Sequence, residues 1–276
     1  MADPRPMGVF DSGTGGLTVV RAIMDELPLE PVVYFGDHAR FPYGPRPLAE
    51  IRGFAVQIAR HLVEEDVKLI VVACNAATSA ALDEVADAVP VPVVGVIDPA
   101  VRAAARATRN GSVGLIGTQA TVSSGAYQRA FDRIAPQVDV LAQACPLFVE
   151  FVERGDTTSP ALMDAAAGYL EPLQEAGVDT LILGCTHYPL LRGAIHHVMG
   201  PDVLLISSAE ETANDVYDVL ASKGLLADVA EELPELPIHR FESSGDPSRF
   251  SALGRRFLGP EFQGAVQVSL AVPQGG

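Results

Sequence analysis

Two of the three cysteines stand at matching places in the sequence. Cys74 follows the apolar run 69–73, and Cys185 follows the run 181–184. Runs of this length predict short buried strands, so each cysteine is expected at the C-terminal end of a strand. A thiol in such a place, beside main-chain and hydroxyl donors, becomes a base or a nucleophile once its pKa falls below the usual value of about 8.5.

The number of reactive thiols separates two kinds of chemistry. A single thiol predicts covalent catalysis, with His187, two residues past Cys185, as the base of a hydrolase. Two thiols on opposite faces of a pocket predict inversion of a carbon stereocentre, because one thiolate removes a proton and the other thiol returns one from the far side. We expect Cys74 and Cys185 to face each other across one small substrate. The third cysteine, Cys145, is predicted to be a buried structural residue.

Other polar side chains in these segments are suited to adjusting the thiols or holding a substrate. Asp11 follows the first apolar run, His187 lies close to Cys185, and Glu153 lies on a predicted short helix. Charges at these positions would shift the protonation of nearby thiols. Hydroxyl and amide groups that can bind carboxylate and ammonium groups occur at Ser12, Asn75, Thr118, Thr121 and Thr186.

The composition suits a well-cored globular protein of one large or two smaller α/β domains, with 276 residues, 48% of them hydrophobic and 20% charged. The net charge of −16 argues against a surface that binds nucleic-acid phosphates. The spacing of the three cysteines fits neither a disulfide framework nor a zinc site, and free thiols predict the reducing cytoplasm. The polar residues 1–6 predict no signal peptide, and no apolar run approaches the roughly 20 residues of a membrane span.

Alternating apolar runs and helical patterns predict parallel sheets with crossover helices. Strands are predicted at 7–10, 31–35, 69–73, 91–96, 112–116, 138–142, 180–183 and 203–206. Helices are predicted at 17–27, 47–65, 78–88, 100–107, 122–135, 147–153, 159–176, 189–199 and 210–220. A linker rich in acids and proline at 231–237 is expected to precede an edge strand at 238–242, a helix at 248–258 and a frayed end at 273–276.

The arrangement of turns and cysteines occurs twice. The turn 11–16 corresponds to the turn 117–121, and Cys74 corresponds to Cys185. The spacing is that of a duplicated domain rather than of a solenoid repeat. We therefore predict an α/β fold of two similar parallel-sheet domains in a pseudo-twofold relation, with the active site in the cleft between them. The predicted domains are 1–98 plus 208–276, and 99–207.

Four separated motifs resemble those of bacterial glutamate racemases. In the family's order and spacing, between residues 7 and 225, they are Phe10-Asp11-Ser12-Gly13-Thr14-Gly15-Gly16, Pro42-Tyr43-Gly44, Ala73-Cys74-Asn75 and Gly184-Cys185-Thr186-His187-Tyr188-Pro189-Leu190. The resemblance implies cofactor-independent interconversion of L- and D-glutamate, which supplies D-glutamate for peptidoglycan and so supports cell shape. It also implies a pair of α/β domains with the site between them, commonly in a homodimer.

The resemblance implies roles for individual residues. Cys74 would act on D-glutamate and Cys185 on L-glutamate, with Asp11, Glu153 and His187 assisting. The implied substrate-binding residues are Asp11, Ser12, Pro42, Tyr43, Gly44, Asn75, Ala76, Thr118, Thr121, Thr186 and His187. One departure is Ala76, where the family usually has threonine. Because the hydroxyl is lost, we expect altered substrate affinity, with Thr78 or Thr121 as the compensating residue.

Other functions fit parts of the pattern. A racemase of the same scaffold would act on aspartate or a hydantoin, whereas a Cys-His hydrolase would form a covalent adduct and would not need Cys74. The turn 13–16 lacks the Lys-Ser/Thr of a P-loop and the full dinucleotide fingerprint, so a nucleotide site is not expected. No metal or cofactor is expected, and no Schiff-base lysine occurs in the motifs. Some glutamate racemases inhibit DNA gyrase, but this chain has no basic surface for an effect through DNA.

Overall fold

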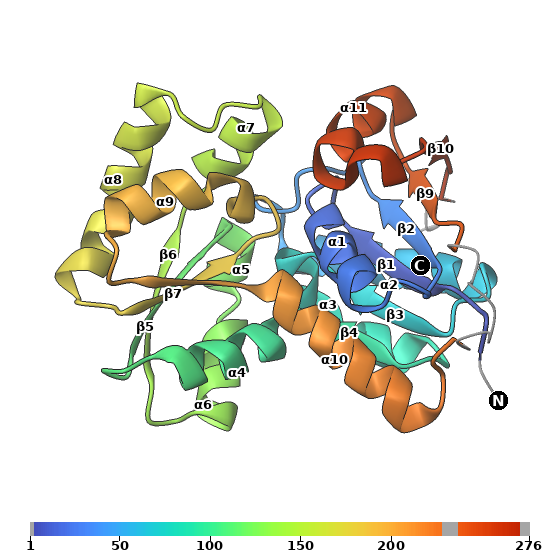
Figure 1. Ribbon diagram of the computed structural model, residues 1–276, viewed down its shortest axis with the longest axis horizontal. Coiled ribbons are helices and arrows are strands. Elements are labelled where there is room, and N and C mark those ends of the chain that lie inside the picture. The colour runs from blue at the N-terminus through green and yellow to red at the C-terminus, as the bar shows by residue number, and fades with distance from the viewer. Residues whose placement is uncertain (1–2, 228–236, 271–276) are drawn as a thin grey trace.

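The computed structural model describes residues 3–227 and 237–270 and contains two parallel β-sheets, each covered by helices (Figure 1). The larger sheet has the order β10-β9-β2-β1-β3-β4, and the smaller has the order β6-β5-β7-β8. The expected pair of parallel-sheet α/β units is therefore confirmed. The strands are β1 (Met7–Asp11), β2 (Val32–Gly36), β3 (Leu69–Val72), β4 (Val93–Gly95), β5 (Ser112–Gly117), β6 (Asp139–Ala144), β7 (Thr180–Gly184), β8 (Leu204–Ser207), β9 (Arg240–Ser243) and β10 (Val266–Gln267).

The two sheets repeat one strand order. β1 lies between β2 and β3, as β5 lies between β6 and β7, and β4 and β8 come next in line. The pairing is parallel, with Val9 opposite Tyr34 and Val71 in one sheet, and Leu115 opposite Ala142 and Ile182 in the other. In each sheet the C-terminal ends of the central strands therefore meet at one edge, which is where open α/β sheets bind ligands.

Helices flank both faces of each sheet, because two separate clusters of buried apolar side chains lie against each one. The helices are α1 (Leu17–Glu26), α2 (Leu48–Glu64), α3 (Asn75–Ala88), α4 (Ile97–Ala107), α5 (Gln119–Ser123), α6 (Ala126–Ile134), α7 (Leu147–Glu153), α8 (Pro160–Glu175), α9 (Arg192–Met199), α10 (Ser208–Lys223) and α11 (Pro247–Leu258), with 3₁₀ turns at Tyr188–Leu191 and Gly259–Glu261.

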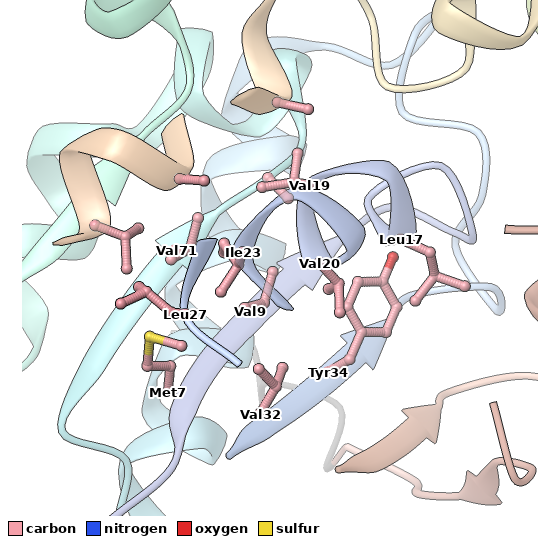
Figure 2. Close-up of a cluster of buried hydrophobic side chains, with 14 of the residues drawn as sticks. Met7, Val9, Leu17, Val19, Val20, Ile23, Leu27, Val32, Tyr34 and Val71 are labelled. Atoms are coloured by element: carbon pink, nitrogen blue, oxygen red, sulfur yellow. The ribbon is translucent and has the colours of Figure 1, made fainter. Parts of the chain in front are cut away.

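The core under α1 fixes the strand that leads to the turn 11–16 (Figure 2). Val9 of β1 and Val71 of β3 belong to the same buried cluster as Val20 and Ile23 of α1. Phe10, one residue further along β1, faces the cluster on the other side of the sheet, as the two-residue period of a strand requires. Each fully buried side chain of this size contributes about 1.5–3 kcal/mol to folding. The position of the turn is therefore set by packing on both faces of the sheet.

Two helices carry the chain between the sheets and are bound to each other. α4 leads from β4 to β5, and α10 leads from β8 back to the larger sheet, where it packs on α1. Ion pairs join Arg102 to Asp215 and Arg106 to Glu211 across these two helices. The predicted domain boundaries, after residues 98 and 207, fall in the first turn of α4 and directly before α10; they stay predictions.

Several helices begin at other residues than predicted, and one predicted helix is divided in two. α3 begins at Asn75, directly after Cys74, and not at residue 78. The predicted helix 122–135 is divided into α5 and α6, because Gly125 adopts a left-handed conformation with φ of 67°. The helix predicted at 100–107 begins earlier, at Ile97, so Asp98 and Pro99 lie in the first turn of α4, where the missing N–H of proline costs nothing.

The C-terminal segment joins the larger sheet. β9 lies between β2 and β10, so the prediction of an edge strand at 238–242 is wrong, and β10 is the outer strand. The predicted linker at 231–237, apart from Pro237, and the predicted frayed end at 273–276 lie outside the described residues. Within the ranges 3–227 and 237–270, no helix is long and apolar enough to cross a membrane.

Candidate active site

Both repeat-related cysteines line one cavity of about 480 Å³. Cys74 follows β3 of the larger sheet, and Cys185 follows β7 of the smaller one, so the two sheets supply opposite walls. The complete lining is Ser12, Phe41, Pro42, Tyr43, Gly44, Pro45, Cys74, Asn75, Ala76, Thr118, Gln119, Pro146, Val149, Glu150, Glu153, Arg154, Cys185, Thr186 and His187. Most residues singled out from the sequence are thus brought together, whereas Asp11 and Thr121 lie behind this lining.

Cys74 lies at the N-terminus of α3, where it is 5% exposed. Its thiol donates to the hydroxyl of Ser12 over 3.8 Å. Burial raises the pKa of the Cys74 thiol, and the negative charge of Asp11 adds to that effect. The protonated thiol is therefore the favoured form of Cys74 in the empty cavity.

Cys185 has the opposite electrostatic surroundings. Nδ1 of His187 lies 4.0 Å from Cys185 Sγ, and Nε2 of the same ring lies 3.0 Å from Oε1 of Glu153. Burial acts to lower the pKa of His187, but the hydrogen bonds to Cys185 and Glu153 prevail and raise it to about 10. The ring is therefore an imidazolium at neutral pH, and its positive charge lies beside the sulfur of Cys185.

Asp11 supports the site from behind. Its carboxylate is fully buried and accepts hydrogen bonds from the backbone N–H of Gly13 at 3.0 Å and from the hydroxyl of Thr186 at 3.4 Å. The turn after β1 also passes very close to the Cys185 loop, since a Cβ placed on Gly15 would lie 2.6 Å from Nδ1 of His187. Asp11 thus connects the two walls and acts on Cys74 through its charge.

Two threonines of the second turn pair with each other. Thr118 lines the cavity, and its hydroxyl caps α5 by accepting from the backbone N–H of Thr121 at 3.3 Å. The two hydroxyl oxygens lie 3.1 Å apart, and Thr121 is fully buried. The hydroxyl of Thr78 donates to the carbonyl of Val72 at 2.8 Å. Neither Thr78 nor Thr121 is among the residues that line the cavity, and the expectation that one of them replaces the hydroxyl missing at Ala76 stays a prediction.

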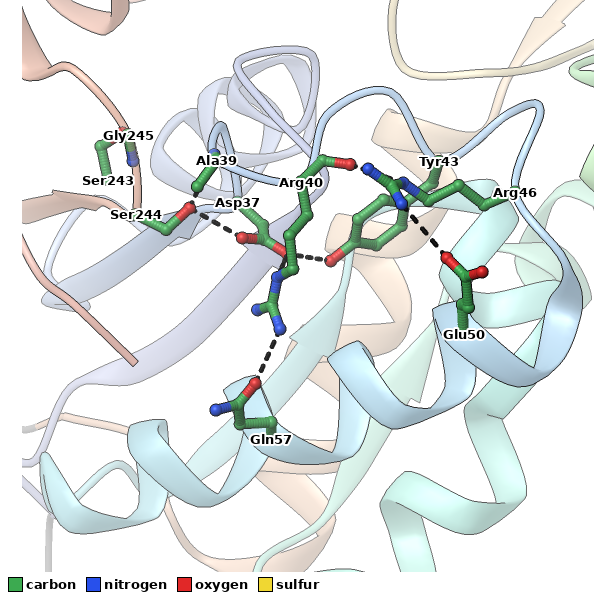
Figure 3. Close-up of polar contacts among 10 residues, drawn as sticks. All are labelled: Asp37, Ala39, Arg40, Tyr43, Arg46, Glu50, Gln57, Ser243, Ser244 and Gly245. Atoms are coloured by element: carbon green, nitrogen blue, oxygen red, sulfur yellow. Dashed lines mark hydrogen bonds and ion pairs between the residues drawn. The ribbon is translucent and has the colours of Figure 1, made fainter. Parts of the chain in front are cut away.

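The loop that carries Pro42, Tyr43 and Gly44 is held by a buried carboxylate that sequence reasoning missed (Figure 3). Asp37 is fully buried and accepts hydrogen bonds from the hydroxyl groups of Tyr43 and Ser244, so the C-terminal segment supports this loop. At its far end the loop reaches the smaller sheet, where the carbonyl of Gly44 accepts from the N–H of Ala120 at 2.9 Å. The only signal in the sequence was the position of Asp37 at the end of a strand.

Asn75 is oriented by another residue that the motifs did not indicate. The hydroxyl of Tyr127, on α6 of the smaller sheet, donates to Asn75 Oδ1 at 2.7 Å. The amide nitrogen of Asn75 is buried and has no hydrogen-bond partner among the described residues. Since Asn75 lines the cavity, this N–H₂ group is left to bind a ligand.

One cluster outside the cavity has the ligand types of a metal site. Side-chain ligand atoms of His61, Glu65 and Glu242 lie within 4.8 Å of one another. The guanidinium of Arg240, however, pairs with both carboxylates, and His61 Nε2 lies 2.7 Å from Glu242. The hydrogen bond to Glu242 raises the pKa of His61, and Arg240 already pairs with both carboxylates, so we assign a polar network that fastens β9 to α2.

Cys145 lies in the core of the smaller sheet. It is fully buried among apolar side chains, does not line the cavity, and donates its thiol to the carbonyl of Gln143 at 3.7 Å. Burial raises the pKa of this thiol. Its surroundings are those of an inert structural cysteine.

The chain matches the family model described as Asp/Glu/Hydantoin racemase over residues 17–216. It is 54% identical to the glutamate racemase of Beutenbergia cavernae, a match that covers 98% of this chain and 96% of that protein. It is 56% identical to the glutamate racemase of Corynebacterium glutamicum, with 92% of each chain covered.

Solved structures give the same result. Glutamate racemase from Francisella tularensis in complex with D-glutamate superposes with a TM-score of 0.89 and 37% identity, covering 97% of this chain and 98% of that one. Glutamate racemase from Thermus thermophilus in complex with β-chloro-D-alanine has a TM-score of 0.85 and 48% identity, with 98% and 99% covered. An aspartate racemase homologue from Pyrococcus horikoshii shares the fold at 18% identity, with a TM-score of 0.54 and 79% and 99% covered.

Proposed function

Because the chain belongs to the Asp/Glu/hydantoin racemase family, we propose that it interconverts L- and D-glutamate by proton transfer between Cys74, the α-carbon and Cys185. The observation that carries the proposal is the placement of both thiols on one cavity, one from each sheet. A substrate bound between them presents opposite faces of its α-carbon to the two sulfurs.

The unlike surroundings of the thiols define the direction of each half-reaction. Cys74 carries the proton in the empty enzyme, and the imidazolium of His187 lies beside Cys185. The Cys185 thiolate takes the α-proton of L-glutamate, and the electron pair of that C–H bond passes to the α-carbon and its carboxylate. The thiol of Cys74 then donates its proton to the opposite face, which leaves D-glutamate, a Cys185 thiol and a Cys74 thiolate. The reverse sequence converts D-glutamate.

The polar groups of the lining fit the substrate's carboxylates. The free amide N–H₂ of Asn75 and the first backbone N–H groups of α3 form a donor set for one carboxylate, beside the Cys74 thiol. Ser12, Tyr43, Gly44 and the Thr186 region supply further donors around the cavity. Ala76 contributes only its backbone N–H here, because its side chain lacks the hydroxyl usual in the family.

Glutamate is favoured over aspartate and hydantoins by the relatives that share more than half of this chain's residues, since these carry the name glutamate racemase. The aspartate racemase homologue shares only the fold. A Cys-His hydrolase built on Cys185 and His187 would leave Cys74 on the same cavity without a purpose. The hydrolase hypothesis predicts a covalent adduct on the enzyme and an activity that survives the loss of Cys74.

The test compares single substitutions of the two thiols. Racemisation of each enantiomer is followed by circular dichroism, and exchange of the α-proton by NMR in deuterium oxide, without added cofactor. We expect the unaltered protein to racemise glutamate, whereas Cys74→Ser and Cys185→Ser each lose racemisation and Cys145→Ala keeps it. Full racemisation in either serine variant would refute the two-thiol mechanism. A requirement for pyridoxal phosphate would refute cofactor independence.

In the cell we propose that the protein acts in the cytoplasm and supplies D-glutamate for peptidoglycan, as the family resemblance implies. We also propose that it works as a homodimer. Multi-angle light scattering of the purified chain should give about twice the monomer mass, and a single-chain mass would refute the dimer. Inhibition of DNA gyrase stays an expectation drawn from the family.

A further inference from the structure

The ring of Phe41 lies beside the imidazolium of His187, a contact to which the two-thiol reaction gives no role. The two ring centres are 5.9 Å apart, and the ring planes are inclined at 37°. Phe41 belongs to the loop after β2, whereas His187 follows β7 of the other sheet, so the contact joins the two walls of the cavity. An aromatic ring attracts a cation that lies toward its face within about 6 Å of its centre, and the charge of an imidazolium is spread over its ring. Phe41 is therefore placed to favour the charged form of His187.

The titratable groups around His187 come from other elements of the site. Cys185 precedes it in the loop after β7, Glu153 ends α7, and Asp11 ends β1. Burial acts against the imidazolium, and Cys185, Glu153 and Asp11 favour it. The loop after β2 reaches His187 through Phe41, whose side chain carries no charge. A substitution of Phe41 therefore leaves every titratable partner of His187 in place.

Phe41 is itself confined by its neighbours in the larger sheet. A Cβ placed on Gly13 would lie 2.9 Å from Cδ2 of Phe41, so the turn 11–16 passes directly against the ring. The ring centre of His38 lies 6.4 Å from that of Phe41. His38 in turn meets the ring of Phe250 on α11 edge-on, with the centres 5.1 Å apart. A row of rings thus leads from the cavity back to the C-terminal segment.

The backbone that leads to Phe41 is fastened by Ser244, which follows β9. The hydroxyl of Ser244 accepts from the N–H of Ala39 at 3.0 Å and donates to Oδ1 of Asp37 at 2.7 Å (Figure 3). Its own backbone N–H donates to the carbonyl of Gly36 at 3.1 Å. Ser244 lies outside the cavity lining, so it acts on the site only through this loop.

We propose that Phe41 is a positioning residue that holds the imidazolium of His187 against Cys185. The C-terminal segment fixes Phe41 in that place through Ser244. The proposal rests on the proposed two-thiol reaction and deepens it, because both residues act through His187. Phe41 has no acid or base to offer, so it acts by its position and by the electron density of its ring face. Loss of the ring should therefore change the charge and the placement of His187.

The experiment compares Phe41→Leu, which keeps an apolar side chain, with Phe41→Tyr, which keeps the ring. NMR titration of protein with isotope-labelled histidine gives the pKa of His187, and His187→Asn assigns its signal. We expect Phe41→Leu to lower that pKa by about 0.5–1 unit, because the attraction of the ring for the cation is lost. In the same variant kcat for glutamate should fall about threefold to tenfold, with KM within about twofold. Phe41→Tyr should keep the pKa and recover most of kcat.

A second pair of variants tests the support from outside the cavity. Ser244→Ala removes both hydrogen bonds of its hydroxyl, and the matched control is Ser222→Ala, an exposed serine of α10 whose hydroxyl donates to the carbonyl of Val219. We expect Ser244→Ala to lower kcat about twofold to fivefold and to lower the pKa of His187, as in Phe41→Leu. Ser222→Ala should match the unaltered protein.

The titration separates positioning from a general loss of structure. An unchanged pKa of His187 in folded Phe41→Leu, or a loss of kcat that Phe41→Tyr shares in full, would overturn the proposal for Phe41. An unchanged pKa in Ser244→Ala would overturn the part given to the C-terminal segment. Absence of glutamate racemisation in the unaltered protein would instead refute the proposed function, and the pKa of His187 would still show whether Phe41 favours the imidazolium.

Discussion

Gly15 allows the turn after β1 to pass against the Cys185 loop, and replacing it by alanine tests whether that approach positions His187. A Cβ at this position would lie 2.6 Å from Nδ1 and 2.7 Å from Cε1 of His187, and closer still to the hydroxyl of Thr186. Neither neighbour moves freely, since His187 contacts Cys185 and Glu153, and Thr186 donates to Asp11.

The size of the effect follows from the shift that the new methyl group requires. Ordinary contact begins near 3.4 Å, so the ring must move by about 0.8 Å (3.4 minus 2.6). A movement of this size alters both contacts of His187, and misplacement of a catalytic group by about 1 Å costs roughly 100-fold in rate. We expect kcat to fall about 100-fold, equivalent to about 2.7 kcal/mol. Overpacking costs about 1–3 kcal/mol of folding stability, so the protein should remain folded.

The assay is racemisation of both enantiomers of glutamate, with thermal unfolding measured on the same samples. The matched control is Gly168→Ala on α8, where an added Cβ meets no atom within 4 Å. That control should keep the rate and gain up to about 1 kcal/mol of stability, because alanine favours a helix over glycine. A kcat of folded Gly15→Ala within threefold of the unaltered protein would show that the close approach does not position His187.

Three other substitutions test separate parts of the structure. Glu153→Gln should lower the pKa of His187 from about 10. Because the imidazolium is present below that pKa and lost above it, the alkaline limb of the pH–rate profile should move to lower pH. We also expect kcat to fall about tenfold. Lys68 Nζ lies 2.5 Å from the buried carboxylate of Glu30. Lys68→Met leaves that carboxylate without its cation, so urea unfolding should show a loss of about 3–5 kcal/mol in stability. Adding Glu30→Gln should recover most of the lost stability. Ala76→Thr should lower KM about two- to tenfold by restoring one hydroxyl donor, and an unchanged KM would mean that no substrate group lies within its reach.

The sequence predicts those parts of the site that lie close to a strand end. Cys74, Cys185 and Asp11 each follow an apolar run, and strands that run parallel bring such positions to one edge of a sheet. The duplicated order of turns and cysteines also predicts two sheets with one strand order. Local patterns suffice here because a buried strand fixes where its next residue lies.

Residues that act across long sequence separations could not be found in this way. Tyr127 reaches Asn75 from a helix of the other sheet, and Asp37 is held by Ser244 from the C-terminal segment. No local pattern distinguishes such residues from ordinary helix or loop positions. The edge-strand prediction for 238–242 failed for the same reason, since nothing nearby in the sequence showed that β10 would pair outside it.

A duplicated scaffold creates a difficulty that the charges around the thiols resolve. Two-base racemisation requires one thiol and one thiolate, whereas equivalent positions in two similar sheets would give both sulfurs the same protonation. The negative charge of Asp11 acts on Cys74, and the imidazolium of His187 lies beside Cys185. The repeat thus sets the positions of the two sulfurs. Residues that differ between its two copies give the sulfurs different electrostatic surroundings. The charges around the two sulfurs, rather than the positions of the sulfurs, therefore distinguish the two half-reactions.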